Sequence, residues 1–236
     1  MKTLESTTDV RGGCSVQRLV GRHSWACLIL GDCLPMLSEI VCDVVMSDPP
    51  YGIALSNNDV DGHRREADYT LHGDENQAAG IAMLEWAELL EMPTIVFASP
   101  WKPWPGKWRN LIAWDKGGAV GGGGDIKTCL KRTWELVQVA RNRPLEGRRD
   151  ESVWRIPATP QDTKDHICAK PVKLMGALVN QFSAAGETIC DPFMGSGSTG
   201  VAAVRLHRNF IGIELDAAHY KTACDRIAHE LDGALL

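Results

Sequence analysis

The stretch Asp191-Pro-Phe-Met-Gly-Ser-Gly-Ser-Thr-Gly200 decides the fold class of this 236-residue chain. It follows a short apolar run, Thr188–Cys190, which predicts a buried strand. Its glycines predict a tight turn, and Thr199–Leu206 then predicts a helix. Another apolar run, Phe210–Ile213, predicts a second strand, which ends in Glu214. A strand, a glycine-rich turn, a helix and a strand in this order are typical of an open α/β sheet, which binds cofactors at the carboxyl ends of its strands.

The rest of the chain repeats the alternation of strands and helices. Further strands are predicted at Trp25–Leu30, Cys42–Met46, Thr94–Ala98, Leu111–Trp114, Glu135–Ala140 and Val153–Ile156. Helices are predicted at Leu34–Ile40, at Ile81–Leu89, from Pro171 onward and after Asp216, a good N-cap. The alternation predicts an α/β protein with a doubly wound sheet. Outside these elements, residues 1–22 predict a loose leader and residues 54–77 a polar loop.

Composition excludes several classes of protein. Hydrophobic residues make up 44% of the chain and charged residues 23%, which excludes a disordered tail. No apolar run approaches the ~18–20 residues that span a bilayer, and residues 1–22 lack the apolar core of a signal peptide. We therefore expect a cytoplasmic protein that makes no membrane contact. The eight cysteines contain no CxxC pair, so we expect reduced, buried thiols and no zinc site.

The charge is uneven along the chain. The formal net charge is −5, but the segment Trp101–Lys173 carries 15 Lys+Arg against 8 Asp+Glu, a net of +7, which leaves −12 for the remainder. The same segment holds six of the eight tryptophans. A basic stretch with interleaved aromatic residues is one footprint of nucleic-acid binding. A solvated basic face over a Trp-rich core explains the pattern equally well.

The second motif, Asp48-Pro-Pro-Tyr51, follows the strand predicted at Cys42–Met46. Its two prolines stiffen the backbone, so a carboxylate, a carbonyl and an aromatic ring keep a fixed relation. The exocyclic amine of a base is a poor nucleophile because its lone pair is delocalised into the ring. The Asp48 carboxylate and the Pro49 carbonyl can orient the amine hydrogens and free the lone pair, and Tyr51 can stack on the base. Taken alone the tetrapeptide predicts a plain turn, but together with the glycine-rich loop it is a strong signal.

Two classes of cofactor fit the glycine-rich loop. Gly195-x-Gly-x-x-Gly200 satisfies the dinucleotide fingerprint, and Glu214 is placed to accept hydrogen bonds from ribose hydroxyls. Asp191 at the strand end, however, would lie badly near a pyrophosphate. It suits a cationic nucleoside without phosphate, such as S-adenosylmethionine. The chain also lacks the catalytic His, Lys and Tyr constellation of an NAD oxidoreductase.

In combination, the two motifs resemble those of S-adenosylmethionine-dependent DNA amino-methyltransferases, which methylate adenine N6 or cytosine N4. Their order is similar to that of the β group, in which DPPY precedes the cofactor loop, and the resemblance covers most of residues 28–231. It implies a Rossmann-like methyltransferase sheet with circularly permuted motif order and a short inserted target-recognition segment. It also implies S-adenosylmethionine as cofactor, double-stranded DNA as partner, no metal and, as in many β-group relatives, a homodimer. The small size resembles that of phage or prophage orphan methyltransferases.

The resemblance implies a role for each matching residue. The catalytic residues are Asp48, Pro49, Pro50 and Tyr51. The cofactor-binding residues are Asp32, His166, Lys170, Pro171, Asp191, Pro192, Phe193, Gly195, Ser196, Gly197, Ser198 and Glu214. Tyr220 and Arg226 match the helix that ends such domains.

Two positions depart from the family pattern. Ile167 stands where the family usually has Pro, which leaves the local geometry at His166 open. His166 itself fits a cap of the following helix as well as a cofactor contact. Ser198 replaces a frequent Thr but keeps the hydroxyl.

The basic, Trp-rich segment lies where the family places its target-recognition part. Its candidates for phosphate contacts, which position DNA without reading its sequence, are Lys102, Lys107, Arg109, Lys116, Lys127, Lys131 and Arg132. The run Gly121–Gly124 predicts either a loop that orders on DNA or a plain surface loop. The resulting division is a leader at 1–22, a catalytic half at 23–100, the target-recognition segment at 101–165 and an S-adenosylmethionine-binding half at 166–236.

We therefore expect a site-specific enzyme that methylates the N6 amine of an adenine flipped out of duplex DNA. Asp48, rather than Ser, at the first motif position favours adenine N6 over cytosine N4. Cytosine N4 remains the alternative, followed by an RNA or protein amine as substrate. A non-catalytic DNA-binding subunit is a further alternative, against which the intact DPPY motif argues.

Overall fold

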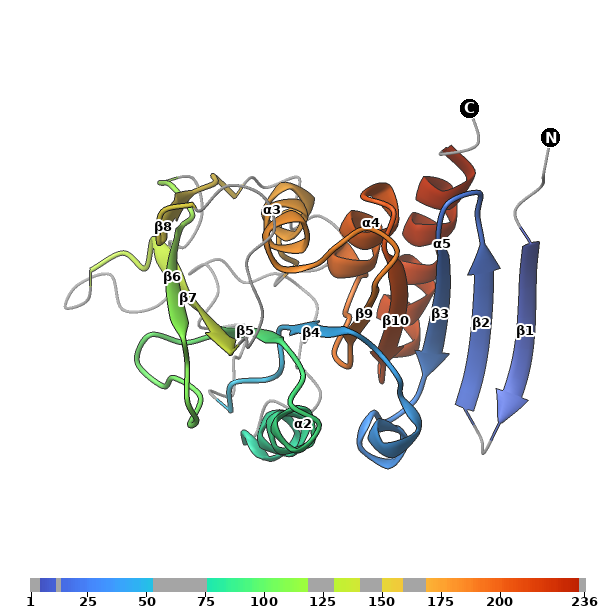
Figure 1. Ribbon diagram of the computed structural model, residues 1–236, viewed down its shortest axis with the longest axis horizontal. Helices are drawn as coiled ribbons and strands as arrows, with labels where there is room; N and C mark the ends of the chain where they lie inside the picture. Colours follow the sequence, from blue (N-terminus) through green and yellow to red (C-terminus); the bar gives the residue numbers. More distant parts are fainter. Residues whose placement is uncertain are drawn as a thin grey trace, which may run out of the picture.

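A computed structural model describes residues 5–11, 14–52, 76–118, 130–140, 150–158 and 169–233, and of residues 5–11 only the backbone. The described strands form one ten-stranded sheet in the order β1-β2-β3-β10-β9-β4-β5-β7-β6-β8 (Figure 1). They are β1 (Glu5–Arg11), β2 (Cys14–Val20), β3 (Trp25–Leu30), β4 (Val44–Ser47), β5 (Thr94–Ala98), β6 (Asn110–Asp115), β7 (Trp134–Ala140), β8 (Val153–Arg155), β9 (Thr188–Asp191) and β10 (Asn209–Glu214). Most of the predicted polar loop, the predicted glycine run, Lys127, His166 and Ile167 lie outside the described residues.

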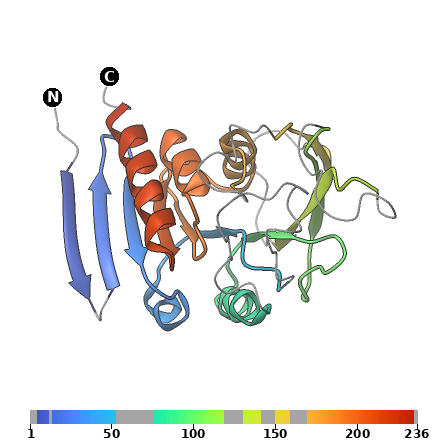
Figure 2. The ribbon, with the colours of Figure 1, turned by 180° about the vertical axis from the view of Figure 1, so that it is seen from behind.

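Helices cover both faces of this sheet. On one face lie α3 (Val172–Phe182), α4 (Ser198–Arg205) and α5 (Ala217–Gly233) (Figures 1 and 2). On the other lie α2 (Ala78–Leu89) and a 3-10 helix, η1 (Leu34–Glu39). The three layers confirm the doubly wound α/β sheet that the sequence predicts.

The centre of the sheet is parallel. Strands β3, β10, β9, β4 and β5 are successive neighbours and all run in the same direction. Their carboxyl ends therefore lie at one edge of the sheet. Every residue of β4 and β5 is buried, which explains why these strands appear in the sequence as unbroken apolar runs.

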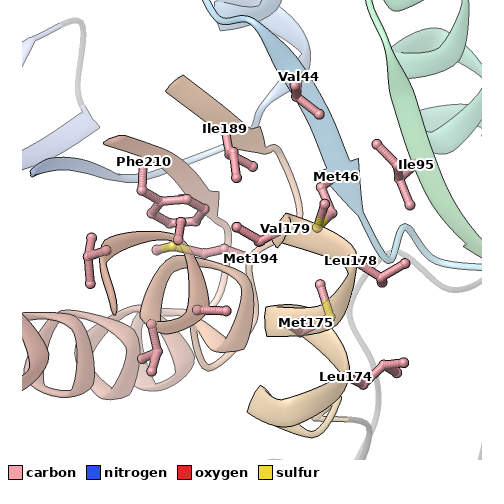
Figure 3. Packing of buried hydrophobic residues seen from close by; sticks show 14 of the residues in the cluster. Val44, Met46, Ile95, Leu174, Met175, Leu178, Val179, Ile189, Met194 and Phe210 are labelled. Carbon is pink, nitrogen blue, oxygen red and sulfur yellow. The ribbon is translucent and has the colours of Figure 1, made fainter. Parts of the chain in front are cut away.

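Alternate residues of the central strands face the two helical layers. In β5, Phe97 packs in the cluster under α3, α4 and α5, whereas Val96 packs in the cluster under α2 and η1. Figure 3 shows Met46 of β4 and Ile95 of β5 on the side of the sheet that α3 covers with Leu178. Each such fully buried side chain stabilises the fold by about 1.5–3 kcal/mol. This packing fixes the strand ends from which the functional loops extend.

The N-terminal region corrects one prediction. Instead of a loose leader over residues 1–22, β1 and β2 form an antiparallel hairpin, and β2 pairs antiparallel with β3. In β2 only Val16 and Leu19 are buried, three positions apart, which is not the alternation that marks a half-buried strand. The hairpin therefore gives little signal in the sequence.

The segment predicted as an insert, 101–165, contributes to the main sheet. β7 lies antiparallel between β5 and β6, and β8 pairs with the outer edge of β6. Ile112, Trp114, Val137 and Val139 join the same core cluster as β4 and β5. β6 and β7 therefore form part of the main sheet, and the assignment of residues 101–165 to target recognition stays a prediction.

The tryptophans of this segment divide between core and surface. Trp104, Trp114 and Trp154 are buried, and their indole N–H groups donate to backbone carbonyls. Trp101 is 65% exposed and Trp134 40%. The Trp-rich pattern thus comes partly from an ordinary core and partly from exposed rings that remain available to a partner.

Candidate active site

Four carboxylates follow the carboxyl ends of four neighbouring parallel strands. Asp32 lies just after β3, Glu214 ends β10, Asp191 ends β9 and Asp48 lies just after β4. Because these strands lie side by side in this order, the four residues form a row along one edge of the sheet. The row joins the DPPY motif to the glycine-rich loop, although the two are far apart in the sequence.

Asp48 is held by groups from its own loop and from a distant segment. The Tyr51 hydroxyl donates a hydrogen bond to Asp48 Oδ1, and Lys170 Nζ lies 2.7 Å from Asp48 Oδ2. The Asp48 side chain keeps 25% exposure, so it is open to an incoming group. Burial raises the pKa of Asp48, the Lys170 ammonium opposes that rise, and the negative charge of Glu135 adds to it.

Tyr51 is fixed by a residue that the motif analysis does not single out. Its ring meets the ring of Trp104 edge to face, with centroids 6.3 Å apart. Trp104 is itself anchored, because its indole Nε1 donates to the carbonyl of Phe97 at 2.7 Å and its backbone N–H donates to Gln138 Oε1 at 2.7 Å. Only the burial of Trp104 in the folded sheet identifies this role.

Lys170 connects Asp48 to a second acid. Its Nζ lies 3.1 Å from Glu135 Oε2, at the start of β7, and 4.9 Å from the centre of the Phe97 ring. The other oxygen of Glu135 lies 3.0 Å from Lys116 Nζ. Lys116, Glu135, Lys170 and Asp48 therefore alternate in charge. Two lysines around Glu135 outweigh the effect of burial and lower its pKa.

Asp191 braces the junction between the two motifs. Its carboxylate accepts hydrogen bonds from the hydroxyls of Ser47 and Thr199, each at 2.6 Å, and from the backbone N–H of Phe193 at 3.1 Å. The residue is only 2% exposed, and burial raises its pKa to about 6. Ser47 directly precedes Asp48, so this bridge ties the DPPY motif to the start of the glycine-rich loop and of α4.

The loop itself is shaped by Gly197 and Glu214. Gly197 adopts a left-handed conformation with φ +82°, and a Cβ there would lie 2.8 Å from the side chain of Ala223. Glu214 accepts hydrogen bonds from the backbone N–H groups of Gly195 and Asp216, both at 2.8 Å. Burial raises the pKa of Glu214. Its carboxylate therefore faces the loop that the sequence associates with it.

The loop also has hydrogen-bonding capacity left for a ligand. The Ser198 hydroxyl is buried at the start of α4 and has no hydrogen-bond partner among the described residues. The first N–H groups of any helix lack partners within the helix. Ser196, the neighbouring hydroxyl, is held by Arg226, whose Nη1 donates to both oxygens of Ser196 at 2.7 and 3.0 Å. The residues present thus fit a polar ligand at this loop.

The remaining candidates for cofactor binding lie around this edge. Asp32 is exposed, and its Oδ1 accepts a hydrogen bond from the backbone N–H of Leu34, the first residue of η1, at 3.0 Å. Pro192 is buried and Phe193 half-buried beside the loop. Pro171 precedes the first residue of α3, as the sequence predicts. Lys170 differs from these candidates, since its ammonium forms ion pairs with Asp48 and Glu135.

The described residues that are predicted to contact phosphates divide into exposed side chains and one that is largely buried. Exposed side chains that fit the prediction belong to Lys102, Lys107, Arg109, Lys131 and Arg132. The Arg132 guanidinium lies 5.0 Å from the centre of the exposed Trp101 ring, and Lys102 Nζ donates to the carbonyl of Gly52 beside the DPPY motif. Lys116 differs from these exposed residues, because its side chain is only 14% exposed and its ammonium pairs with Glu135.

A family comparison bears on what this edge of the sheet is. The model of the DNA methylase family N6_N4_Mtase matches residues 107–225, which make up half of the chain. The chain belongs to this family. The matched region contains Lys170, the glycine-rich loop and Glu214, and it ends within α5. The family comprises DNA amino-methyltransferases of the adenine-N6 and cytosine-N4 types.

Individual relatives match over different lengths. The type II methyltransferase M.HindIII of Haemophilus influenzae is 32% identical over 97 residues, which cover 41% of this chain and 29% of that protein. The type II methyltransferase M2.MboI of Moraxella bovis is 39% identical over 97 residues, 39% of this chain and 35% of that protein. The matches therefore span about a third of the length of these relatives. The putative methylase YubD of Escherichia coli is 26% identical over 216 residues, 85% of this chain and 89% of that protein.

Solved structures share the fold. An M1.HpyAVI–SAM complex has a TM-score of 0.60 at 20% identity, and the match covers 84% of this chain and 98% of that one. The cytosine-N4-specific PvuII DNA methyltransferase has a TM-score of 0.61 at 15% identity, with 88% and 93% covered. These likenesses confirm the Rossmann-like methyltransferase sheet that the sequence predicts.

Two further features of the described residues bear on the class of site. Within the residues that the structure describes, no three or more His, Cys, Asp and Glu side chains are grouped so that they could hold a metal ion. None of the described helices is both long enough and apolar enough to cross a membrane.

Proposed function

We propose that this protein is an S-adenosylmethionine-dependent DNA methyltransferase that methylates the N6 amine of an adenine flipped out of duplex DNA. One observation carries the proposal. Asp48 is fixed between Tyr51 and Lys170, and the Ser47–Asp191 hydrogen bond joins it to the glycine-rich loop. Membership of the DNA methylase family supports the reaction, and the likeness to a protein solved as an M1.HpyAVI–SAM complex supports the cofactor.

The residues of the glycine-rich loop fit the proposed cofactor. When bound, S-adenosylmethionine supplies a methyl group that its sulfonium charge makes electrophilic. The Ser198 hydroxyl and the N-terminus of α4 are available to its carboxylate. Glu214 and Asp32 are available to hydroxyl and amine groups of its adenosine. The row of carboxylates at this edge favours a cation over a phosphate-bearing dinucleotide.

The DPPY motif supplies the groups that act on the base. A base must leave the duplex to reach this edge, which costs a few kcal/mol of unstacking and unpairing. The Asp48 carboxylate and the Pro49 carbonyl then accept hydrogen bonds from the amine, so that its lone pair is no longer committed to the ring. Tyr51, braced by Trp104, offers an aromatic face to the base. The contribution of these residues is positioning and electrostatic preorganisation.

Adenine N6 is proposed over cytosine N4 because Asp48 stands at the first position of the motif. The experiment that tests the function uses duplex DNA and S-adenosylmethionine with a tritiated methyl group. After the reaction, the DNA is digested to nucleosides, which are identified by mass.

We expect label in N6-methyladenine. Label in N4-methylcytosine would keep the enzyme class and change the base. Label in RNA or protein but not in DNA would contradict DNA as the substrate. Failure to label any of the three, in protein that binds S-adenosylmethionine, would support the non-catalytic alternative.

A further inference from the structure

Lys170 lies in a position that the cofactor role implied by its motif does not explain. Its side chain is 11% exposed, and its ammonium lies between two carboxylates, 2.7 Å from Asp48 Oδ2 and 3.1 Å from Glu135 Oε2. These acids come from different elements, since Asp48 follows β4 and Glu135 lies at the start of β7. Lys170 itself directly precedes Pro171, the N-cap of α3.

We propose that Lys170 is a positioning residue for Asp48, which it holds ionised and aimed, and that Glu135 anchors Lys170 from β7. This inference rests on the proposed function, because it assigns the ion pair a part in the same reaction. It adds two residues, one on β7 and one before α3, to the machinery around the DPPY motif.

The geometry explains how the lysine aims the carboxylate. The two oxygens of Asp48 have different fixed partners, with the Tyr51 hydroxyl on Oδ1 and Lys170 on Oδ2. A carboxylate bonded at both oxygens cannot rotate freely about its Cβ–Cγ bond. Each oxygen still has a second lone pair, so Asp48 remains able to accept a hydrogen bond from an amine.

Charge explains why the lysine is needed to keep Asp48 ionised. Asp48 is faced by Tyr51 from its own loop, by Lys170 from the segment before α3, by Glu135 from β7 and by Asp191 from the end of β9. Lys170 is the cation in this set. Burial and the nearby acids raise the pKa of Asp48, and Lys170 opposes them. A neutral Asp48 would carry a proton on one of its two oxygens and would be a weaker acceptor for the amine.

Glu135 has the geometry of an anchor. Lys116 holds its Oε1 at 3.0 Å, so its Oε2 is directed to Lys170. An ammonium on a flexible four-carbon stem gains a defined position when two fixed anions share it. The alternation of Lys116, Glu135, Lys170 and Asp48 also leaves no net charge in this half-buried cluster, which limits the cost of desolvation.

The test follows the ionisation of Asp48 directly, by carbon-13 NMR of labelled aspartate carboxyls in the full chain. The Asp48 signal is assigned by its loss in Asp48→Asn. Lys170→Met should raise the midpoint of the Asp48 carboxyl titration by about one to three pH units. Lys170→Arg, which keeps the positive charge, should leave this midpoint near the wild-type value. Lys173→Met removes the same charge as Lys170→Met from an exposed site three residues away and should leave the midpoint unchanged.

Glu135→Gln removes both the anchor of Lys170 and a negative charge near Asp48, so its effect is followed by the rate of methyl transfer, which should fall while the affinity for S-adenosylmethionine stays near the wild-type value. An unchanged rate would remove Glu135 from the proposal.

The outcomes separate the roles. If Lys170→Met leaves the midpoint unchanged while the affinity for S-adenosylmethionine falls in calorimetry, Lys170 is a cofactor residue and the proposal is wrong. If Lys170→Met does not fold, Lys170→Gln decides, and an unchanged midpoint overturns the proposal.

A kinetic measurement connects the ionisation to the reaction. The acidic limb of kcat/KM against pH should move in the same direction as the Asp48 midpoint in each variant. A limb that stays in place while the midpoint moves would overturn the positioning role. A wild-type protein that methylates no nucleic acid would contradict the proposed function, and the NMR titration would still report on the ion pair itself.

Discussion

At the residue scale, Asp191 has an environment that makes stability depend on pH. Folding raises its pKa from 3.8 to about 6 through burial, so the folded state binds the proton more tightly than the unfolded state. The contribution of Asp191 protonation to the free energy of unfolding is therefore fully present below about pH 4. It is lost as the pH rises through about 6. Relative to Asp191→Asn, the wild-type free energy of unfolding should fall by about 3 kcal/mol between pH 4 and 7. Urea denaturation of both proteins across this range measures it, and a difference that is independent of pH would show that Asp191 does not titrate there.

Glu214 allows a second prediction at the same scale. Its carboxylate holds the backbone N–H groups of Gly195 and Asp216 and is proposed to bind ribose. Glu214→Ala should weaken S-adenosylmethionine binding by about 10- to 100-fold, as expected for the loss of hydrogen bonds to a charged group. Glu230→Ala is the matched control, because Glu230 of α5 is half-buried and its carboxylate pairs with the exposed Arg205 of α4. Calorimetry that finds equal affinities for both variants would remove Glu214 from the cofactor site.

At the scale of elements, α4 is held very close to its neighbours. A Cβ at Gly200 would lie 2.5 Å from Ile227 Cδ1 of α5 and 2.6 Å from Phe210 Cε1 of β10. Gly200→Ala should therefore destabilise the protein by about 1–3 kcal/mol through overpacking. Gly176→Ala in α3 is the control, since its Cβ would meet only Leu206 Cδ1 at 3.9 Å, and it should be neutral or stabilise by up to about 1 kcal/mol. Equal unfolding free energies for the two variants in urea would contradict the close approach of α4.

The same scale explains what the sequence can and cannot predict. Strands β3 and β5 have the predicted bounds, because both are continuous apolar runs, and β5 is buried along its whole length. The hairpin of β1 and β2 has no such run. The place of β7 between β5 and β6 depends on pairing between distant segments, which no local pattern records.

The active-site residues likewise divide into those that a local sequence pattern predicts and those that only the fold brings together. The DPPY motif and the glycine-rich loop are local and are visible in the sequence. The Lys170–Asp48 pair, Glu135 and Trp104 depend on which strands are neighbours, so only the folded sheet brings them together.

At the scale of the whole molecule, the charge separates into an acidic edge and exposed basic groups. Lys102 lies beside the DPPY motif, where its Nζ donates to the carbonyl of Gly52 at 3.2 Å. If Lys102 contacts a phosphate, Lys102→Met should weaken DNA binding to all sequences and reduce the slope of log K against log salt by about one. Lys221→Met is the control, because Lys221 is an exposed lysine of α5 that pairs with Asp225. Fluorescence anisotropy at several salt concentrations measures the slope, and equal slopes for Lys102→Met and wild type would exclude the phosphate contact.

The central claim is that Asp48, at the carboxyl edge of the sheet, acts on the amine that receives the methyl group. The most direct measurement is single-turnover transfer of a labelled methyl group from S-adenosylmethionine to duplex DNA by wild type and Asp48→Ala, with cofactor affinity measured on the same samples. We predict that wild type labels the DNA and that Asp48→Ala slows transfer by about 100-fold or more while it binds the cofactor nearly as well. Transfer by Asp48→Ala at the wild-type rate would contradict this role for Asp48.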